Sequence, residues 1–110
     1  MALNHSLPLD PIDIRPLGEQ LGQAVTSSLI KTGSLQLMRV VLRAGAVLPE
    51  HSVAGEITIQ CLEGRASVVM PTRSVELAAG QLVVLPGAEL HAVHAVTATS
   101  LLVTVLLLRH

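Results

Sequence analysis

Short apolar runs broken by glycine and proline are the feature that most limits how this 110-residue chain can fold. No window has the periodicity and capping residues of a long amphipathic helix. Around eight short strands, at spacings of about 8–12 residues, are instead typical of a β-sandwich, barrel or jelly roll. We therefore predict one all-β domain, with strands at residues 24–31, 34–43, 57–62, 66–70, 74–77, 82–85, 90–96 and 101–108.

The two ends of the chain differ in character. Residues 1–22 are expected to form a short N-terminal arm, because Pro8, Pro11 and Pro16 break helices. Residues 23–110 are expected to form the β-barrel domain. The run 101–108 is apolar on both faces, so we expect it in the centre of a sheet or in a subunit interface. Two connections are also predicted: a break between strands at 49–55, and a tight hairpin at Glu63-Gly64.

Composition excludes several classes of partner. Half of the residues are hydrophobic, 14% are charged and the formal net charge is −1, which argues against nucleic-acid binding. The longest apolar run is shorter than the roughly 18 residues of a membrane helix, and the N-terminus lacks the basic region of a signal peptide. The single cysteine, Cys61, cannot form an internal disulfide. We therefore expect a cytoplasmic protein with no membrane partner.

The chain contains no Phe, Tyr or Trp, so a binding pocket has no aromatic stacking platform. Such a pocket must combine aliphatic side chains with a few polar groups or a metal. Five histidines are the strongest candidates for chemistry. His5 and His110 lie near the chain ends, where solvated tails are expected. The three others, His51, His91 and His94, lie within the β-prone region.

Two of these histidines lie at fixed distances from glycine and proline residues. His51 follows a glycine by six positions and precedes Leu62-Glu63-Gly64, and His91 follows a glycine by eleven positions and a proline by five. These segments resemble the two motifs of the cupin superfamily, in its small single-domain, RmlC-like form. The first motif is matched at Gly45, His51 and Gly64, and the second at Gly80, Pro86 and His91. The resemblance covers roughly residues 35–108 and implies an antiparallel jelly-roll β-barrel.

The motifs depart from the family pattern at the metal ligands. The resemblance implies a site of His-x-His, Glu and a later His, but Val53 and Ile57 occupy the second histidine and the glutamate positions. His51 and His91 alone remain, whereas metal sites generally use at least three protein ligands. The two histidines therefore form either a polar handle or weak site for Zn, Ni, Fe or Mn, or a pair without present chemistry. Glu56 substitutes for the missing carboxylate only if a bulge near Gly55 turns it inward.

Strand alternation then predicts the pocket. Val53, Ile57, Ile59 and Cys61 share one parity, so we expect them to face inward with His51 and His91. Cys61 is expected to behave as a small hydrophobe. His94 has the opposite parity from His91 and is expected at the surface.

Three functions remain open. The first is a cupin that binds a small metabolite, with a weakened or absent metal site and no clear catalytic machinery. The second is a metal-dependent dioxygenase or isomerase. The third resembles the metal-free sugar epimerases, whose tyrosine acid has no counterpart here. Since few charges are available to cover an apolar surface, we also expect a homodimer that uses the N-terminal arm or a strand.

Overall fold

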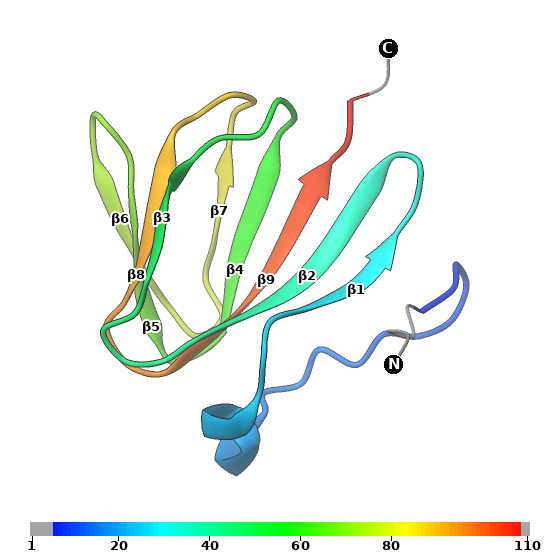
Figure 1. Ribbon diagram of the computed structural model, residues 1–110, viewed down its shortest axis with the longest axis horizontal. Coiled ribbons are helices and arrows are strands. Elements are labelled where there is room, and N and C mark those ends of the chain that lie inside the picture. The colour runs from blue at the N-terminus through cyan, green and yellow to red at the C-terminus, as the bar shows by residue number, and fades with distance from the viewer. Residues whose placement is uncertain (1–5, 109–110) are drawn as a thin grey trace.

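The computed structural model describes residues 6–108 as two packed antiparallel sheets (Figure 1). His5 and His110 lie outside the described residues. Nine strands and one short 3-10 helix are present in the described part of the chain: η1 Gly18–Gln23, β1 Ser27–Lys31, β2 Leu35–Leu42, β3 Val47–His51, β4 Ile57–Glu63, β5 Arg65–Val69, β6 Ser74–Ala78, β7 Leu82–Leu85, β8 His91–Ala95 and β9 Thr99–Leu106.

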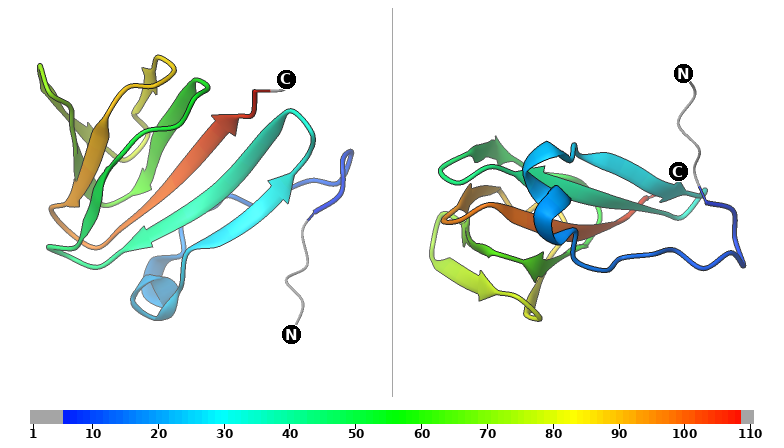
Figure 2. Two further views of the ribbon diagram at one scale, coloured as in Figure 1. Left: turned by 45° about the horizontal axis from the view of Figure 1, so that its top comes forward. Right: turned by 90° about the horizontal axis from the view of Figure 1, so that it is seen from below.

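The larger sheet has the order β1-β2-β9-β4-β7 and the smaller one the order β3-β8-β5-β6. Every neighbouring pair is antiparallel, so the predicted all-β jelly roll is confirmed. The connections β2–β3, β4–β5 and β8–β9 gather at one end of the two sheets (Figure 1), and Figure 2 shows the sheets as stacked layers. No helix among residues 6–108 is long and apolar enough to cross a membrane.

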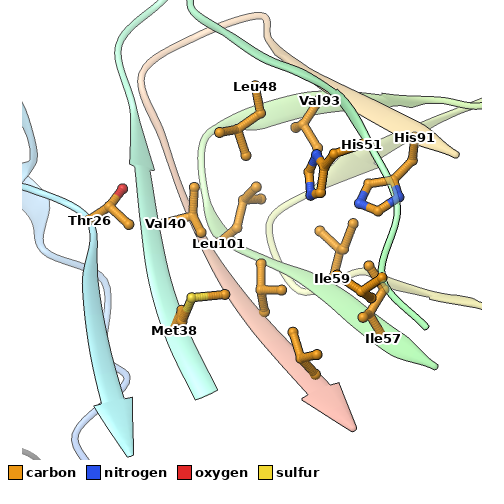
Figure 3. A pocket seen from close by; sticks show the side chains of 13 residues that line it. Thr26, Met38, Val40, Leu48, His51, Ile57, Ile59, His91, Val93 and Leu101 are labelled. Carbon is orange, nitrogen blue, oxygen red and sulfur yellow. The ribbon is translucent and has the colours of Figure 1, made fainter. Parts of the chain in front are cut away.

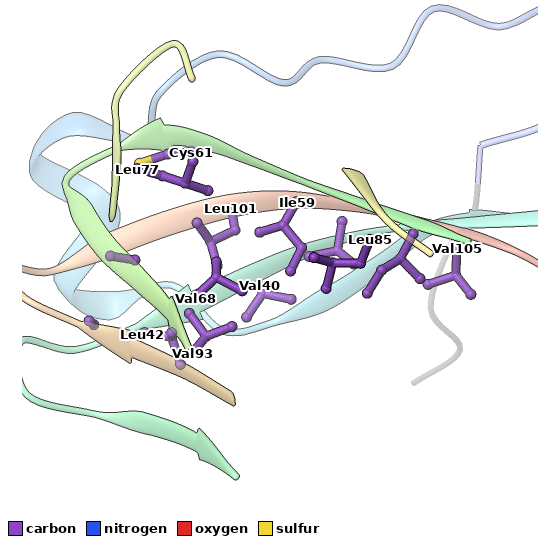
Figure 4. Close-up of a cluster of buried hydrophobic side chains, with 14 residues drawn as sticks. Val40, Leu42, Ile59, Cys61, Val68, Leu77, Leu85, Val93, Leu101 and Val105 are labelled. Carbon is purple, nitrogen blue, oxygen red and sulfur yellow. The ribbon is translucent and has the colours of Figure 1, made fainter. Parts of the chain in front are cut away.

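Strand β9 lies in the centre of the larger sheet, between β2 and β4. Six of its eight residues are buried, as expected for a strand that is apolar on both faces. Its inward side chains join those of the other strands in the core between the sheets (Figure 4). Leu101, at the middle of this core, is fully buried. The prediction of a central position for this run is therefore confirmed.

Two predicted connections are wrong. Residues 49–55 were expected as a break, but β3 extends through Pro49 to His51. Proline is tolerated there because β3 is the edge strand of its sheet and has a free side. At Gly64 the chain does turn tightly, with φ of +86°. The strands on either side do not pair as a hairpin, because the turn carries the chain from β4 in one sheet to β5 in the other.

Residues 6–26 contain η1 but no strand, and they contact the larger sheet at separate points. The Ser6 N–H donates to the Leu29 carbonyl oxygen at 2.9 Å. The Glu63 carboxylate accepts hydrogen bonds from the backbone N–H of Leu17 at 2.8 Å and of Gly18 at 3.0 Å. Burial raises the pKa of Glu63, but these hydrogen bonds, a third from the Ser100 hydroxyl and the Arg39 charge together outweigh it and leave the pKa below its usual value. The arm is thus held by an ionised carboxylate from the core sheet.

Candidate functional site

A cavity of about 250 Å³ lies between the two sheets (Figure 3). Thirteen side chains line it, and all except Thr26, His51 and His91 are aliphatic or, for Met38, a thioether. They come from both sheets, because the inward faces of β2, β4 and β9 meet those of β3 and β8. Among residues 6–108, the only ionisable side chains on its wall are the two imidazoles.

The two histidines meet because they are cross-strand partners at the end of β3 and the start of β8. Leu48 pairs with Val93, but His51 pairs with His91, so three steps on β3 match two on β8. This extra residue reverses the alternation of β3 and turns His51 to the same inward face as Leu48. The two imidazole centroids are 4.4 Å apart (Figure 3). His51 is exposed at the rim, whereas His91 is 2% exposed.

The hydrogen bonds of the two rings fix their tautomers. His51 Nδ1 lies 2.9 Å from the Pro49 carbonyl oxygen, and His91 Nδ1 lies 2.9 Å from that of Glu89. A carbonyl oxygen only accepts, so each Nδ1 carries the proton and donates it. In the neutral ring, Nε2 then has a free lone pair that accepts a hydrogen bond or binds a metal. The same kind of backbone contact thus leaves Nε2 as the free nitrogen of both histidines.

Most of the predicted pocket residues lie on the cavity wall, two through the alternation of β4 and one from the loop before it. Val53, Ile57 and Ile59 line the cavity, and the latter two are 4% and 2% exposed. Glu56 is exposed, so no bulge turns its carboxylate inward. His94 is also exposed, on the outer face of β8.

The prediction that Cys61 lines the pocket needs correction, because Cys61 does not line the cavity with the other three residues. Its side chain is on the inward face of β4 and fully buried, but it lies nearer the β4–β5 turn. There it packs in the core, and its Sγ is 3.5 Å from the carbonyl oxygens of Glu63 and Gly64. Figure 4 shows Cys61 next to Leu77. Burial raises the pKa of the Cys61 thiol above its ordinary value, which makes it a poor nucleophile.

The cavity residues on the other strands were not predicted from the sequence. Met38 and Val40 come from β2, and Leu101, Val103 and Val105 come from β9. A signal was available, since each set repeats at every second position as an inward face requires. What the sequence lacked was the topology that brings β2 and β9 opposite β3 and β8.

The donor set does not fit a metal site with three or more protein ligands. The two positions where the cupin pattern has further ligands hold Val53 and Ile57, whose side chains form apolar wall. Across residues 6–108, no three His, Cys, Asp or Glu side chains are grouped so that they could hold a metal ion. The cavity therefore offers a metal two imidazole nitrogens, on a wall that is otherwise aliphatic apart from Thr26 and the Met38 thioether.

Comparison with solved structures defines the class of fold. An RmlC-like cupin protein from Desulfovibrio desulfuricans matches with a TM-score of 0.69 at 26% identity, covering 96% of each chain. A conserved protein of unknown function from Streptococcus pyogenes matches with a TM-score of 0.76 at 22% identity, covering 100% of each chain. An RmlC-like cupin family protein from Methanocaldococcus jannaschii, described as a double-stranded β-helix, matches at 0.74 and 13% identity, covering 92% of this chain and 93% of that one.

The fold is thus a double-stranded β-helix. More particularly, the chain has the cupin fold in its small, RmlC-like form, as the two histidine motifs suggested. No protein-family model and no curated protein sequence matches the chain. The similar structures include KdgF from a Halomonas species and EutQ from Clostridium difficile, so the fold alone does not define one function.

Proposed function

We propose that this protein binds a small, largely apolar molecule in the cavity between its sheets. The observation that carries this proposal is the wall itself: about 250 Å³ of space lined by hydrocarbon, with two imidazoles at one end. Ligand sites are typically apolar pockets with a few polar groups that fix orientation. A cavity of about 150 Å³ already accommodates benzene, so this one has room for a somewhat larger molecule.

A metal, if present, is held weakly under this proposal. Two imidazoles are fewer ligands than the three that catalytic zinc sites use. His51 and His91 would supply both protein ligands through their Nε2 atoms, because each Nδ1 donates to a carbonyl oxygen. We therefore assign no reaction step to a metal in this chain.

Blocking the cavity tests the proposal. Val53→Phe projects a ring from the wall into the cavity, whereas Val96→Phe adds the same ring at a position that is 53% exposed. We expect cyclohexane to shift the methyl NMR signals of Ile57 and Ile59 saturably in the unmodified protein and in Val96→Phe, but not in Val53→Phe. Leu48→Phe, also on the wall, provides a second blocking variant.

Two results would contradict this proposal. One is the absence of a saturable shift in the unmodified protein. The other is equal binding by a folded Val53→Phe variant, because occupancy would then lie elsewhere.

We also propose that the protein is a homodimer that uses the outer face of the larger sheet at β7. Leu82 and Val84 point away from the core there and are 53% and 54% exposed. Their neighbours on β4, Gln60 and Thr58, are uncharged. An apolar, uncharged sheet face is typical of an interface between subunits.

Light scattering at low micromolar concentration tests the assembly. We expect twice the chain mass of 11.5 kDa. Val84→Glu places a charge in the proposed interface and should yield monomers, while Val96→Glu should not. A mass of 11.5 kDa for the unmodified protein would rule out the dimer.

A further inference from the structure

The side chains that residues 6–108 place at the polar end of the cavity offer hydrogen-bond acceptors and no donors. Besides the imidazoles, Thr26 is the only lining side chain of the described residues with a polar oxygen or nitrogen. Its hydroxyl is already used, because it accepts from the Val41 N–H at 2.9 Å and faces the Val41 carbonyl oxygen at 3.5 Å. The Nε2 atoms of His51 and His91 are the polar side-chain atoms left for a ligand. Both are acceptors when the rings are neutral.

From this pattern we infer that the ligand is an uncharged aliphatic molecule with two hydrogen-bond donors at one end, such as an alkane 1,2-diol. This inference rests on the proposed function and names the ligand class of the same cavity. Because the imidazole centroids are 4.4 Å apart, donors on neighbouring atoms of one molecule reach both rings. The hydrocarbon remainder of the molecule then packs against the aliphatic wall.

The charge of the wall excludes the main alternatives for the polar end. None of the side chains that the described part of the chain contributes to the wall is an Asp, Glu, Lys or Arg. While both rings are neutral, a ligand carboxylate would direct its lone pairs at the lone pairs of two Nε2 atoms, with no cation to offset its burial. A ligand ammonium would find acceptors but no opposite charge, and burying an unpaired ion is strongly unfavourable. Hydroxyl groups donate to both rings without adding a charge.

The different burial of the two rings predicts how the ligand is oriented in the cavity. His91 is 2% exposed and His51 is exposed at the rim, so the pair spans from the interior to the opening. A diol therefore binds with one hydroxyl on the buried ring and the other on the rim ring. Loss of the buried acceptor should have the larger effect, because its hydrogen bond is shielded from water.

The test uses three probes of similar size: hexane-1,2-diol, hexanoate and cyclohexane. Binding is measured by calorimetry and methyl NMR on chelator-treated protein in alkaline buffer. We expect hexane-1,2-diol to bind at least about tenfold more tightly than hexanoate, since two hydrogen bonds contribute roughly that factor. His91→Leu and His51→Leu should each remove much of the diol's advantage, with His91→Leu the larger loss.

Both leucine variants should retain cyclohexane binding, because they leave the cavity apolar and filled to a similar volume. His94→Leu is the matched control, since His94 is exposed on the outer face of the same strand as His91. It should leave all three probes unaffected. If cyclohexane binds but the diol binds no better than hexanoate, the ligand class is wrong and the binding function stands. If no probe binds, both proposals fall.

Discussion

Replacing Gly64 by alanine is expected to destabilise the protein by about 3–5 kcal/mol, the range of severe single substitutions. Gly64 has φ of +86°, a conformation that strains any residue with a side chain. A Cβ atom at this position would also overlap the Ala98 carbonyl oxygen and lie 2.6 Å from Thr99 Oγ1. Thr99 cannot move freely, because its Oγ1 donates to the Thr97 carbonyl oxygen at 2.8 Å and accepts from the Arg65 N–H at 3.2 Å. The turn between the two sheets is therefore closed to any side chain.

Gly80→Ala separates the two causes of that destabilisation. Gly80 has φ of +90°, but a Cβ there meets nothing within 4 Å. Gly80→Ala should lower the free energy of unfolding by about 1–2 kcal/mol, which is the cost of the positive φ alone. Urea unfolding of both variants measures the difference, which isolates the overlap with Ala98. Equal free energies of unfolding for the two variants would show that the β4–β5 turn has more room than the structure gives it.

The fold could be predicted from sequence because its determinants are local. Alternating residues such as Ile57 and Ile59 define an inward face, and glycines with positive φ mark where strands end. The C-terminal run is apolar on both faces, and it lies in the centre of the larger sheet as predicted. Pairing was harder. The turn at Gly64 has the local sequence of a hairpin, and only the positions of β7 and β9 beside β4 decide that β5 joins the other sheet.

The site was harder to predict than the fold, for reasons visible in three residues. The inward position of His51 depends on an irregularity in β3 next to Pro49, in a segment whose proline argued against any strand. Cys61 has the correct parity for the cavity, but parity does not give the depth at which the cavity ends. Nor does it reveal that each Nδ1 is engaged by a carbonyl oxygen two residues earlier. Those contacts decide what the histidines offer a ligand.

The double substitution Val53→His and Ile57→Glu is expected to convert the cavity into a tight metal site. Both side chains line the cavity beside His51 and His91, at the positions where the cupin pattern has ligands. The change raises the number of protein ligands from two to four, which suffices for a divalent transition metal. Elemental analysis should find clearly substoichiometric Zn, Ni, Fe or Mn in the unmodified protein, and near-stoichiometric metal in the variant.

Stability provides a second measure of the same variant. Ile57 is 4% exposed, so a glutamate there buries a carboxylate and should lower the Tm of the metal-free protein. Added metal neutralises that charge and binds only the folded state, so the Tm should rise with metal concentration. Val53→His with Ile57→Gln is the control, since an uncharged amide is a weaker ligand and should give a smaller rise. One metal per chain in the unmodified protein would overturn the weak-site proposal, because two imidazoles would then bind a metal ion as fully as the four ligands of the variant.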